Sequence, residues 1–204
     1  MTKQRKQDAD PGALAHLWRD IERVGVALSD GQWSSLCDQA QVVRFQRDAV
    51  LDQATDIAER WLFICDGVVA SRQTHSDGET TIARFFEPGQ ICANLTSAWK
   101  QIYAADDLIA MTEVKAVDIP DPLFRHELLD GDALGRYFRL KAMETLCFDK
   151  EVLSAKTRFD TEIRFQFLEQ HYTSVLESLR QRDIAAFLGI TPQGLSRFKR
   201  NRAS

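Results

Sequence analysis

The sequence predicts an α+β protein with three parts in chain order: an antiparallel β jelly roll, a long helix and a C-terminal helix-turn-helix. Three observations carry this prediction. Short β-rich runs separated by glycine turns fill residues 42–119, helical spacing covers about 123–154, and two short amphipathic segments meet at Gly189. With 204 residues, 44% of them hydrophobic, the chain is long enough for one large domain or two modest ones.

Apolar residues with helical spacing open the chain between residues 12 and 40, and we expect these helices to cover one end of the jelly roll. The strands are predicted from four β-rich stretches, with turn pairs at Asp66-Gly67, Asp77-Gly78 and Pro88-Gly89. In chain order the stretches are QVVRF, ERWLFICDGVVASRQ, HSDGETTIARFFEPGQIC and LIAMTEVKAVDIP. Short strands at this spacing indicate an antiparallel barrel or jelly roll.

A long helical run follows, from Leu123 or Asp132 to about Ser154, and it carries more apolar surface than one small barrel needs. Its two stripes comprise Leu134, Phe138, Thr145, Phe148 and Val152, and beside them Tyr137, Leu140, Glu144 and Cys147. We predict a dimerisation helix that pairs with its copy; the alternative is a helix that packs only within its own chain. An amphipathic helix from Thr157 leads onward, which places a domain junction near residues 154–160.

The end of the chain is its most basic stretch, although the formal net charge of the whole chain is −4. Between residues 178 and 204 six arginines and lysines stand against Asp183 alone, a local charge of +5. Gly189 fits a left-handed C-cap after a first short helix. Thr191 can cap a second helix, and Pro192 suits its first position. Two helices are therefore predicted to meet at a tight turn.

The second of these helices has two different faces. Leu195 and Phe198 point inward, whereas Gln193, Arg197 and Arg200 form an outward stripe with Ser196 beside it. Gln and Arg side chains can reach base edges, and nearby cations can meet phosphates. We interpret the pair as a DNA-binding helix-turn-helix. The alternative is a helical hairpin with a solvated charged face.

The cysteines and histidines of the sequence do not indicate a metal site or a catalytic site. The four cysteines lie far apart in segments that we interpret as core, so we expect buried reduced thiols, with redox sensing as the alternative. No histidine has a second one within ligand spacing, and we expect no metal, no cofactor and no catalytic residue. These residues are Cys37, Cys65, Cys92 and Cys147, and His16, His75, His126 and His171.

The location expected for the protein is the cytoplasm. The first residues lack the apolar run of a signal peptide, and no stretch approaches the roughly 20 apolar residues of a membrane span. We therefore expect no membrane partner.

Two stretches of the sequence resemble the Crp-Fnr family, the cyclic-AMP receptor protein and its relatives. They are FICDGVV followed by HSDGETTIARFFEPGQ, and IAAFLGITPQGLSRFKR near the end. These stretches are the most specific matches, and the order of jelly roll, long helix and helix-turn-helix resembles the family over nearly the whole chain. It implies a cyclic-nucleotide-binding-like domain that senses an effector at residues 1–130, a dimerisation helix at 131–156 and a helix-turn-helix DNA-binding domain at 157–204. It also implies a homodimer on a near-palindromic DNA site and a contact with RNA polymerase.

Carried onto this sequence, the resemblance implies base-reading residues and a set of phosphate contacts. The base-reading positions fall at Gln193, Ser196 and Arg197. The phosphate contacts fall at Arg180, Arg182, Lys199 and Arg200. Family members usually continue into a β-hairpin wing, whereas this sequence ends seven residues after Arg197. We therefore expect the helix and its basic flank, without a full wing, to supply the DNA affinity.

The effector is where the sequence departs from the family. Cyclic-AMP-binding members hold the ribose with a Gly-Glu pair and the cyclic phosphate with an Arg followed by Ser or Thr. Ala93-Asn94 and Ala104-Ala105 stand at these positions here, so we expect no tight binding of cyclic AMP. Lys100 or Arg72 is the alternative source of positive charge. The clustered cysteines of iron–sulfur members are also absent from the N-terminal region of the sequence.

An unidentified small-molecule effector is thus expected in a pocket with Ala93, Asn94, Leu95, Ala104 and Ala105, although an empty pocket fits these residues equally well. Three function classes follow. The leading one is a sequence-specific, effector-responsive DNA-binding transcription regulator. The second is a ligand-binding signalling module whose C-terminal helices dock on protein. The third is a barrel enzyme, which would need a bound metal.

Overall fold

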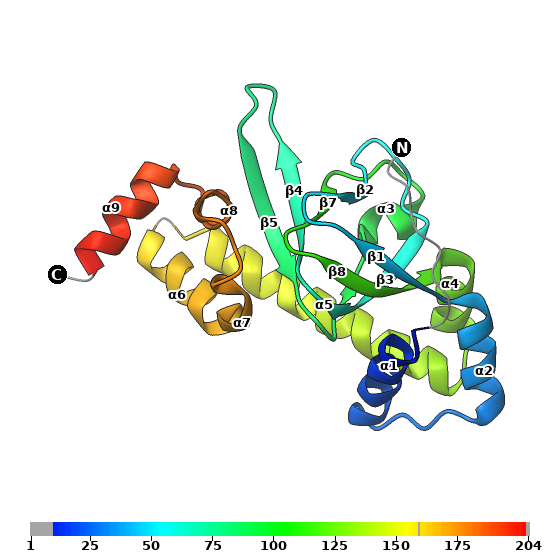
Figure 1. Ribbon diagram of the computed structural model, residues 1–204. Coiled ribbons are helices and arrows are strands. Elements are labelled where there is room, and N and C mark those ends of the chain that lie inside the picture. Colours follow the sequence, from blue (N-terminus) through cyan, green and yellow to red (C-terminus); the bar gives the residue numbers. More distant parts are fainter. Residues whose placement is uncertain (1–9, 159, 203–204) are drawn as a thin grey trace.

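The computed structural model describes residues 10–158 and 160–202, without the side chains of residues 174 and 175. The helices are α1 (Pro11–Arg23), α2 (Asp30–Gln39), α3 (Leu95–Lys100), α4 (Asp121–Asp130), α5 (Ala133–Lys156), α6 (Thr161–His171), α7 (Thr173–Leu176), α8 (Gln181–Leu188) and α9 (Pro192–Arg202). The strands are β1 (Gln41–Phe45), β2 (Val50–Asp52), β3 (Arg60–Asp66), β4 (Val69–Thr74), β5 (Thr80–Phe86), β6 (Ile91–Cys92), β7 (Asp107–Ala110) and β8 (Val114–Pro120). Figure 1 shows α5 running beneath the β-roll, with α1 and α2 near one end of it and α6–α9 at the other.

The described strands form two four-stranded sheets, in the orders β1-β8-β3-β6 and β2-β7-β4-β5, and all neighbours are antiparallel. Gly67, Gly78 and Gly89, from the three expected turn pairs, have φ angles of 84°, 84° and 85°. This left-handed backbone favours glycine. A Cβ on Gly67 would also lie only 2.1 Å from the carbonyl oxygen of Glu113. The predicted architecture of jelly roll, long helix and helix-turn-helix is confirmed.

The two sheets pack against different helices. On the first sheet Trp61 stacks on Phe124 at a ring-centroid distance of 3.8 Å, and Phe124 lies 4.5 Å from Phe138 of α5. On the second sheet Phe85 lies 5.4 Å from Tyr172 and 5.5 Å from Phe187 of α8. Burial of each such ring contributes about 1.5–3 kcal/mol. The second sheet is therefore the platform that positions the C-terminal helices.

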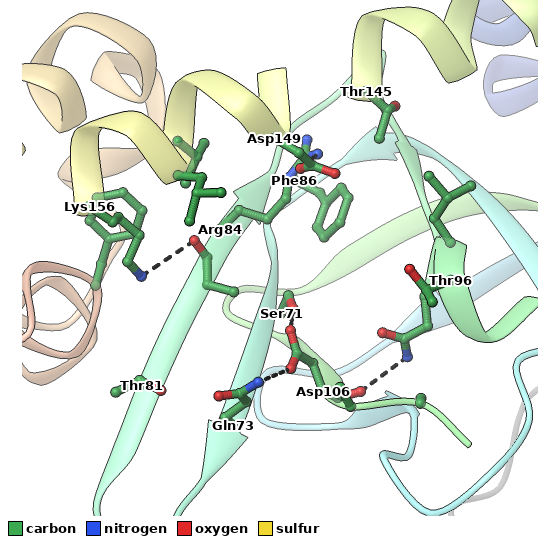
Figure 2. Close-up of a pocket in the computed structure, with 18 of the residues that line it drawn as sticks. Ser71, Gln73, Thr81, Arg84, Phe86, Thr96, Asp106, Thr145, Asp149 and Lys156 are labelled. Carbon is green, nitrogen blue, oxygen red and sulfur yellow. Dashed lines mark hydrogen bonds and ion pairs between the residues drawn. The ribbon is translucent and has the colours of Figure 1, made fainter. Parts of the chain in front are cut away.

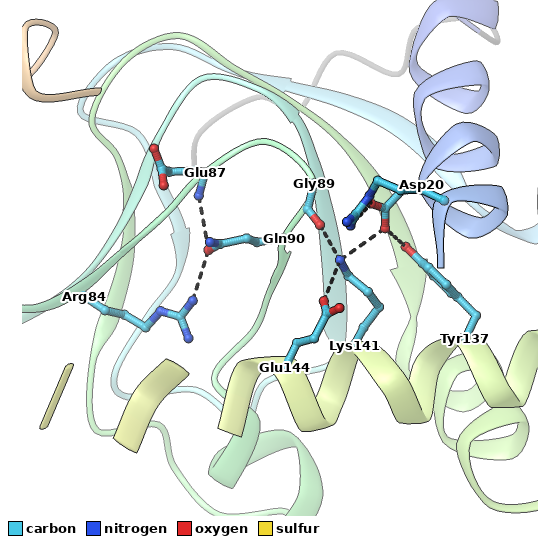
Figure 3. Close-up of polar contacts among 9 residues, drawn as sticks. Asp20, Arg84, Glu87, Gly89, Gln90, Tyr137, Lys141 and Glu144 are labelled. Carbon is cyan, nitrogen blue, oxygen red and sulfur yellow. Dashed lines mark hydrogen bonds and ion pairs between the residues drawn. The ribbon is translucent and has the colours of Figure 1, made fainter. Parts of the chain in front are cut away.

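A buried ionic cluster joins α1 to α5 (Figure 3). Lys141 and Asp20 are 4% and 5% exposed, and the Nζ of Lys141 lies 3.1 Å from the Oδ2 of Asp20. The same Nζ donates to the carbonyl oxygen of Gly89 at 2.7 Å, and the Tyr137 hydroxyl donates to Asp20 at 2.9 Å. Helix α1, the turn before β6 and helix α5 thus meet at one charge pair.

Of the two starts expected for the long helix, Leu123 and Asp132, the structure has the second. Helix α5 begins at Ala133 after its cap Asp132, and residues 121–130 form the separate helix α4, which ends at Gly131. A Cβ on Gly135 would lie 2.2 Å from the Glu127 carbonyl oxygen, so this glycine allows α5 to approach α4 closely. The next helix begins at Thr161, not at Thr157, since the Asp160 side chain caps it by accepting from the Glu162 amide.

The expectation of four buried cysteines is wrong for Cys147, which is exposed on α5, and Cys37 is only half-buried. Cys65 and Cys92 are buried, and burial raises the pKa of the Cys65 thiol to about 11. Cys147 is exposed because its side of α5 faces away from the β-roll of its own chain.

Among the described residues, no group of three or more His, Cys, Asp and Glu side chains is arranged as a metal site. The helices of the described ranges include none with the length and apolar character of a membrane span.

Candidate nucleic-acid interface and ligand cavity

The turn between α8 and α9 is built by the residues that predicted it. Gly189 ends α8 in the left-handed conformation with a φ of 66°, and its amide donates to the carbonyl oxygen of Ala185. The Thr191 hydroxyl then accepts from the Gly194 amide at 3.1 Å at the start of α9. Leu195 and Ala185 are fully buried. The two helices therefore meet as a compact helix-turn-helix.

Helix α9 is also held by ion pairs that sequence reasoning missed. The Arg202 guanidinium lies 2.9 Å from Glu169 and 3.0 Å from Glu162, and 4.8 Å from the Phe165 ring centroid. Both glutamates lie on α6, and nothing in the sequence around them predicted a contact with α9. Arg202 anchors the end of α9 to the rest of the C-terminal helices.

The three expected base-reading side chains lie exposed on α9. The side chains of Gln193 and Arg197 have no hydrogen bond or ion pair with any described residue, and both are free to reach a ligand. The Ser196 hydroxyl donates to the Pro192 carbonyl oxygen at 3.1 Å, which leaves its oxygen able to accept. This face of α9 presents a neutral amide, a hydroxyl and a guanidinium next to each other.

The expected phosphate contacts have different surroundings. Arg180 forms a two-pronged ion pair with Asp48, in the turn between β1 and β2, at 3.0 and 2.7 Å. Arg182 lies 3.7 Å from Asp183, and the Nζ of Lys199 donates to Gln181 at 3.1 Å. Arg200 is exposed on α9. Of these four cations, Arg180 faces the β-roll of its own chain.

A cavity of about 710 Å³ lies between the β-roll, α5 and α8 (Figure 2). All five residues expected around an effector line it: Ala93, Asn94, Leu95, Ala104 and Ala105. Its other walls come from β5, from the C-terminal half of α5 and from residues 186–189 at the end of α8. A single space therefore reaches from the expected effector pocket to the helix-turn-helix.

The wall next to Ala105 is acidic. The Asp106 carboxylate accepts from the Ser71 hydroxyl and from the Gln73 amide, the latter at 2.7 Å. Asn94 donates to the Asp106 carbonyl oxygen at 3.1 Å and to the Asp52 carboxylate at 2.9 Å. At the position where the resemblance to the Crp-Fnr family implies the contact with a cyclic phosphate, this chain has two alanines followed by a carboxylate. An anion at that position would face repulsion.

The cations of the cavity lie elsewhere, on residues that sequence reasoning missed. Arg84 is 6% exposed, pairs with Asp149 at 2.5 Å and stacks on the Phe86 ring at 4.0 Å. Lys156 and Arg164 also line the cavity. Arg84 could have been noticed as a charge inside the apolar strand TTIARFF, whereas the other two carry no sequence signal.

Neither cation that the sequence offered lines the cavity. Lys100 is exposed on α3, and Arg72 lies 4.0 Å from Asp107. The positive charge of the cavity comes from β5, α5 and α6 instead. Lys156 lies next to α8 of the helix-turn-helix, 4.7 Å from the Phe187 ring centroid.

A scan of protein-family models and a search of curated proteins found no match to the chain. Solved structures do match. A CooA mutant from Carboxydothermus hydrogenoformans has a TM-score of 0.66 at 16% identity, over 97% of this chain and 86% of that one. The c-di-GMP-responsive global regulator CLP of Xanthomonas campestris has a TM-score of 0.66 at 13% identity, over 86% and 92%.

A third similar structure is described as a transcriptional regulator of the crp/fnr family from Eubacterium rectale. Its TM-score is 0.65 at 14% identity, over 91% of this chain and 85% of that chain. At these identities the likeness shows the fold. The β-roll, the long helix and the helix-turn-helix are arranged as in these regulators.

Proposed function

We propose that this chain, which has the fold of the Crp/Fnr regulators, is a sequence-specific DNA-binding transcription regulator that acts as an effector-responsive homodimer in the cytoplasm. The observation that carries the proposal is the exposed face of α9, where Gln193, Ser196 and Arg197 stand together on a helix held by Arg202 and Leu195. Such a face suits the major groove, where Gln and Arg can each make paired hydrogen bonds to bases.

The test is selection of genomic DNA fragments by the purified full chain at physiological salt. We expect enrichment of a near-palindrome whose half-sites lie about 34 Å apart, one helical turn of DNA. Salt-sensitive binding without any motif would contradict sequence-specific recognition.

Docking of α8 and α9 on a protein partner is the second candidate, and the surface of α9 disfavours it. Protein interfaces are centred on apolar and aromatic side chains. The large exposed apolar residues of the described chain lie on other elements, and the outward face of α9 is polar and basic.

The structural neighbours reported above are regulators and not enzymes. A contact with RNA polymerase belongs to the proposal by resemblance to the family.

We propose a separate function for each of three regions: residues 1–130 would sense the effector, 131–156 would dimerise and 157–204 would bind DNA. Support for the dimer comes from exposed apolar residues along α5. They include Leu140, Met143, Leu146 and Leu153, with exposed fractions of 37%, 60%, 48% and 63%, and Leu146 and Leu153 also lie at the edge of the cavity. Pairing of two such helices would remove this surface from water.

Cys147 supplies a direct test of the helix pairing, because it is also exposed on α5. A parallel pair of helices brings the two copies of each residue to the same level, and a disulfide needs Cα atoms within about 7 Å. We expect mild oxidation to give a reducible covalent dimer on a denaturing gel. Cys147→Ser should abolish it, whereas Cys37→Ser should not. A dimer in light scattering that never crosslinks through Cys147 would place the interface elsewhere.

Arg180 gives a further prediction, because Asp48 competes with DNA phosphates for its guanidinium. Asp48→Asn keeps the shape of the side chain and removes its charge. We expect binding to DNA of any sequence to become tighter by less than about tenfold, since exposed ion pairs are weak. The measurement is fluorescence anisotropy with a random duplex. Asp77→Asn, in the exposed turn before β5, is the matched control for lost negative charge, and an equal gain in both variants would contradict the competition.

A further inference from the structure

We infer that the cavity binds a small organic anion, with its charged group between Lys156 and Arg164 and its apolar body against α8. The binding part of this inference is independent of the proposed function, and only an effect on DNA binding rests on it. The site differs from the position of the cyclic phosphate in relatives, which here carries Ala104-Ala105.

The first observation is that neither cation forms an ion pair with a carboxylate of the described residues. Among the described residues, neither Lys156 nor Arg164 has a carboxylate oxygen within 4.0 Å of its nitrogens. The Nζ of Lys156 donates to the backbone carbonyl oxygens of Ile82 and Ala83. Arg164 donates from one Nη to the Thr161 hydroxyl at 3.2 Å, and its Nε is buried without a partner. The contrast is Arg84 in the same cavity, which Asp149 neutralises.

The second observation is that the two charges repel each other at the same wall. Burial, and after it the positive charge of Arg164, lower the pKa of Lys156 to about 8, although the negative charge of Asp106 acts in the opposite direction. Two partly buried like charges close together destabilise the folded chain as long as no anion is bound between them. A carboxylate, phosphate or sulfonate between them would remove this repulsion and give both cations a charge-assisted hydrogen bond.

The third observation concerns the shape and the other walls. The cavity of about 710 Å³ is of the size that holds small organic ligands. Val152 and Phe187 supply apolar surface beside the two cations, and Leu188 and Gly189 continue it along the end of α8. An inorganic ion alone would leave this surface empty. The chemistry therefore favours an anion with an aromatic or aliphatic body.

The position of the site also gives it a means of regulation. Lys156 is the last residue of α5, Arg164 lies in the first turn of α6, and α8 is the first helix of the helix-turn-helix. One ligand would thus contact the long helix, the link to the DNA-binding helices and the helix-turn-helix. Its binding would fix the position of α8 and α9 relative to the β-roll.

The test uses two fluorescent probes of similar shape and different charge: anionic 8-anilinonaphthalene-1-sulfonate and neutral N-phenyl-1-naphthylamine. We expect the full chain to bind the anionic probe saturably. In the double variant Lys156→Gln with Arg164→Gln, its affinity should fall by about tenfold or more, since two charge-assisted contacts are lost. The affinity for the neutral probe should stay within about twofold.

Two further variants make the result specific. Lys156→Arg with Arg164→Lys keeps both charges and should keep the preference for the anionic probe. If the glutamine variant does not fold, a loss of this preference in the charge-preserving variant would contradict the anion site. Lys150→Gln removes an exposed charge of α5 outside the cavity and should change nothing. Equal losses for both probes in the double variant, or the same loss in Lys150→Gln, would overturn the anion site.

A last arm separates this inference from the proposed function. With a selected DNA site in hand, saturating anionic probe should change the affinity of the wild-type chain for DNA and leave that of the double variant unchanged. No change in the wild-type chain would overturn the regulatory role. Failure to select any DNA motif would overturn the proposed function and leave the probe measurements as they are.

Discussion

Replacement of Arg197 by alanine is expected to lower the affinity for the selected DNA site by about 1–3 kcal/mol and to relax the preference for one base pair. The reason is that Arg197 is exposed on α9 and has no partner among the described residues, so its guanidinium is available to a base edge. The measurement is a binding titration against the selected site and against each single-base variant of it.

Lys199→Ala is the matched comparison, because Lys199 lies one half-turn further along α9 and its Nζ donates to Gln181 and lies 5.9 Å from the Phe165 ring centroid, without an ion pair among the described residues. As a phosphate contact it should weaken binding to all sequences alike and lower the slope of log affinity against log salt by about one. Equal losses on every sequence for both variants would refute the different roles of the two residues. Unchanged DNA binding in Arg197→Ala would favour docking on protein instead.

Asp20→Ala is expected to have the largest effect on stability, about 3 kcal/mol in the free energy of unfolding. Lys141 is almost completely buried, and without Asp20 the partners that its charge keeps among the described residues are the Gly89 carbonyl oxygen and the half-exposed Glu144 carboxylate. The Tyr137 hydroxyl, also buried, loses its acceptor. Urea unfolding of both proteins measures the difference.

Two further variants test whether Asp20 stabilises the protein by compensating the buried charge of Lys141. Glu144→Ala removes an exposed carboxylate from the same lysine and should cost less than about 1 kcal/mol. Lys141→Met added to Asp20→Ala removes the uncompensated charge and should recover part of the stability. Losses that simply add in the double variant would mean that the two residues stabilise the fold independently.

The same cluster predicts a pH dependence. Burial raises the pKa of Asp20, but the hydrogen bond from Arg23, the charge of Lys141 and the hydrogen bond from Tyr137 outweigh it, so the pKa is below its ordinary value. A lowered pKa in the folded state stabilises the protein above the unfolded pKa of about 4, and this contribution is lost as the pH falls below it. The difference between wild type and Asp20→Ala should therefore shrink below about pH 4.

Local patterns in the sequence were sufficient for the glycine turns of the jelly roll, for the helix-turn-helix and for the surface that we propose to read DNA. Gly67, Gly78 and Gly89 marked turns because only glycine adopts their backbone without strain. Gly189, Thr191 and Pro192 marked the turn before α9 because each matches a fixed place at a helix end. The exposure of Gln193 and Arg197 followed from helical periodicity. All of these depend on neighbours within a few positions in the chain.

Contacts between distant segments were decided by the tertiary structure alone. Lys156 and Arg164 line the cavity, and Asp48 pairs with Arg180 across 132 positions of the sequence, because the C-terminal helices rest on β5. Cys147 was expected in the core and is exposed, since periodicity identifies an apolar stripe but not the partner that covers it. Periodicity reports which side of a helix prefers to be buried, whereas charge partners are set by the packing of whole elements.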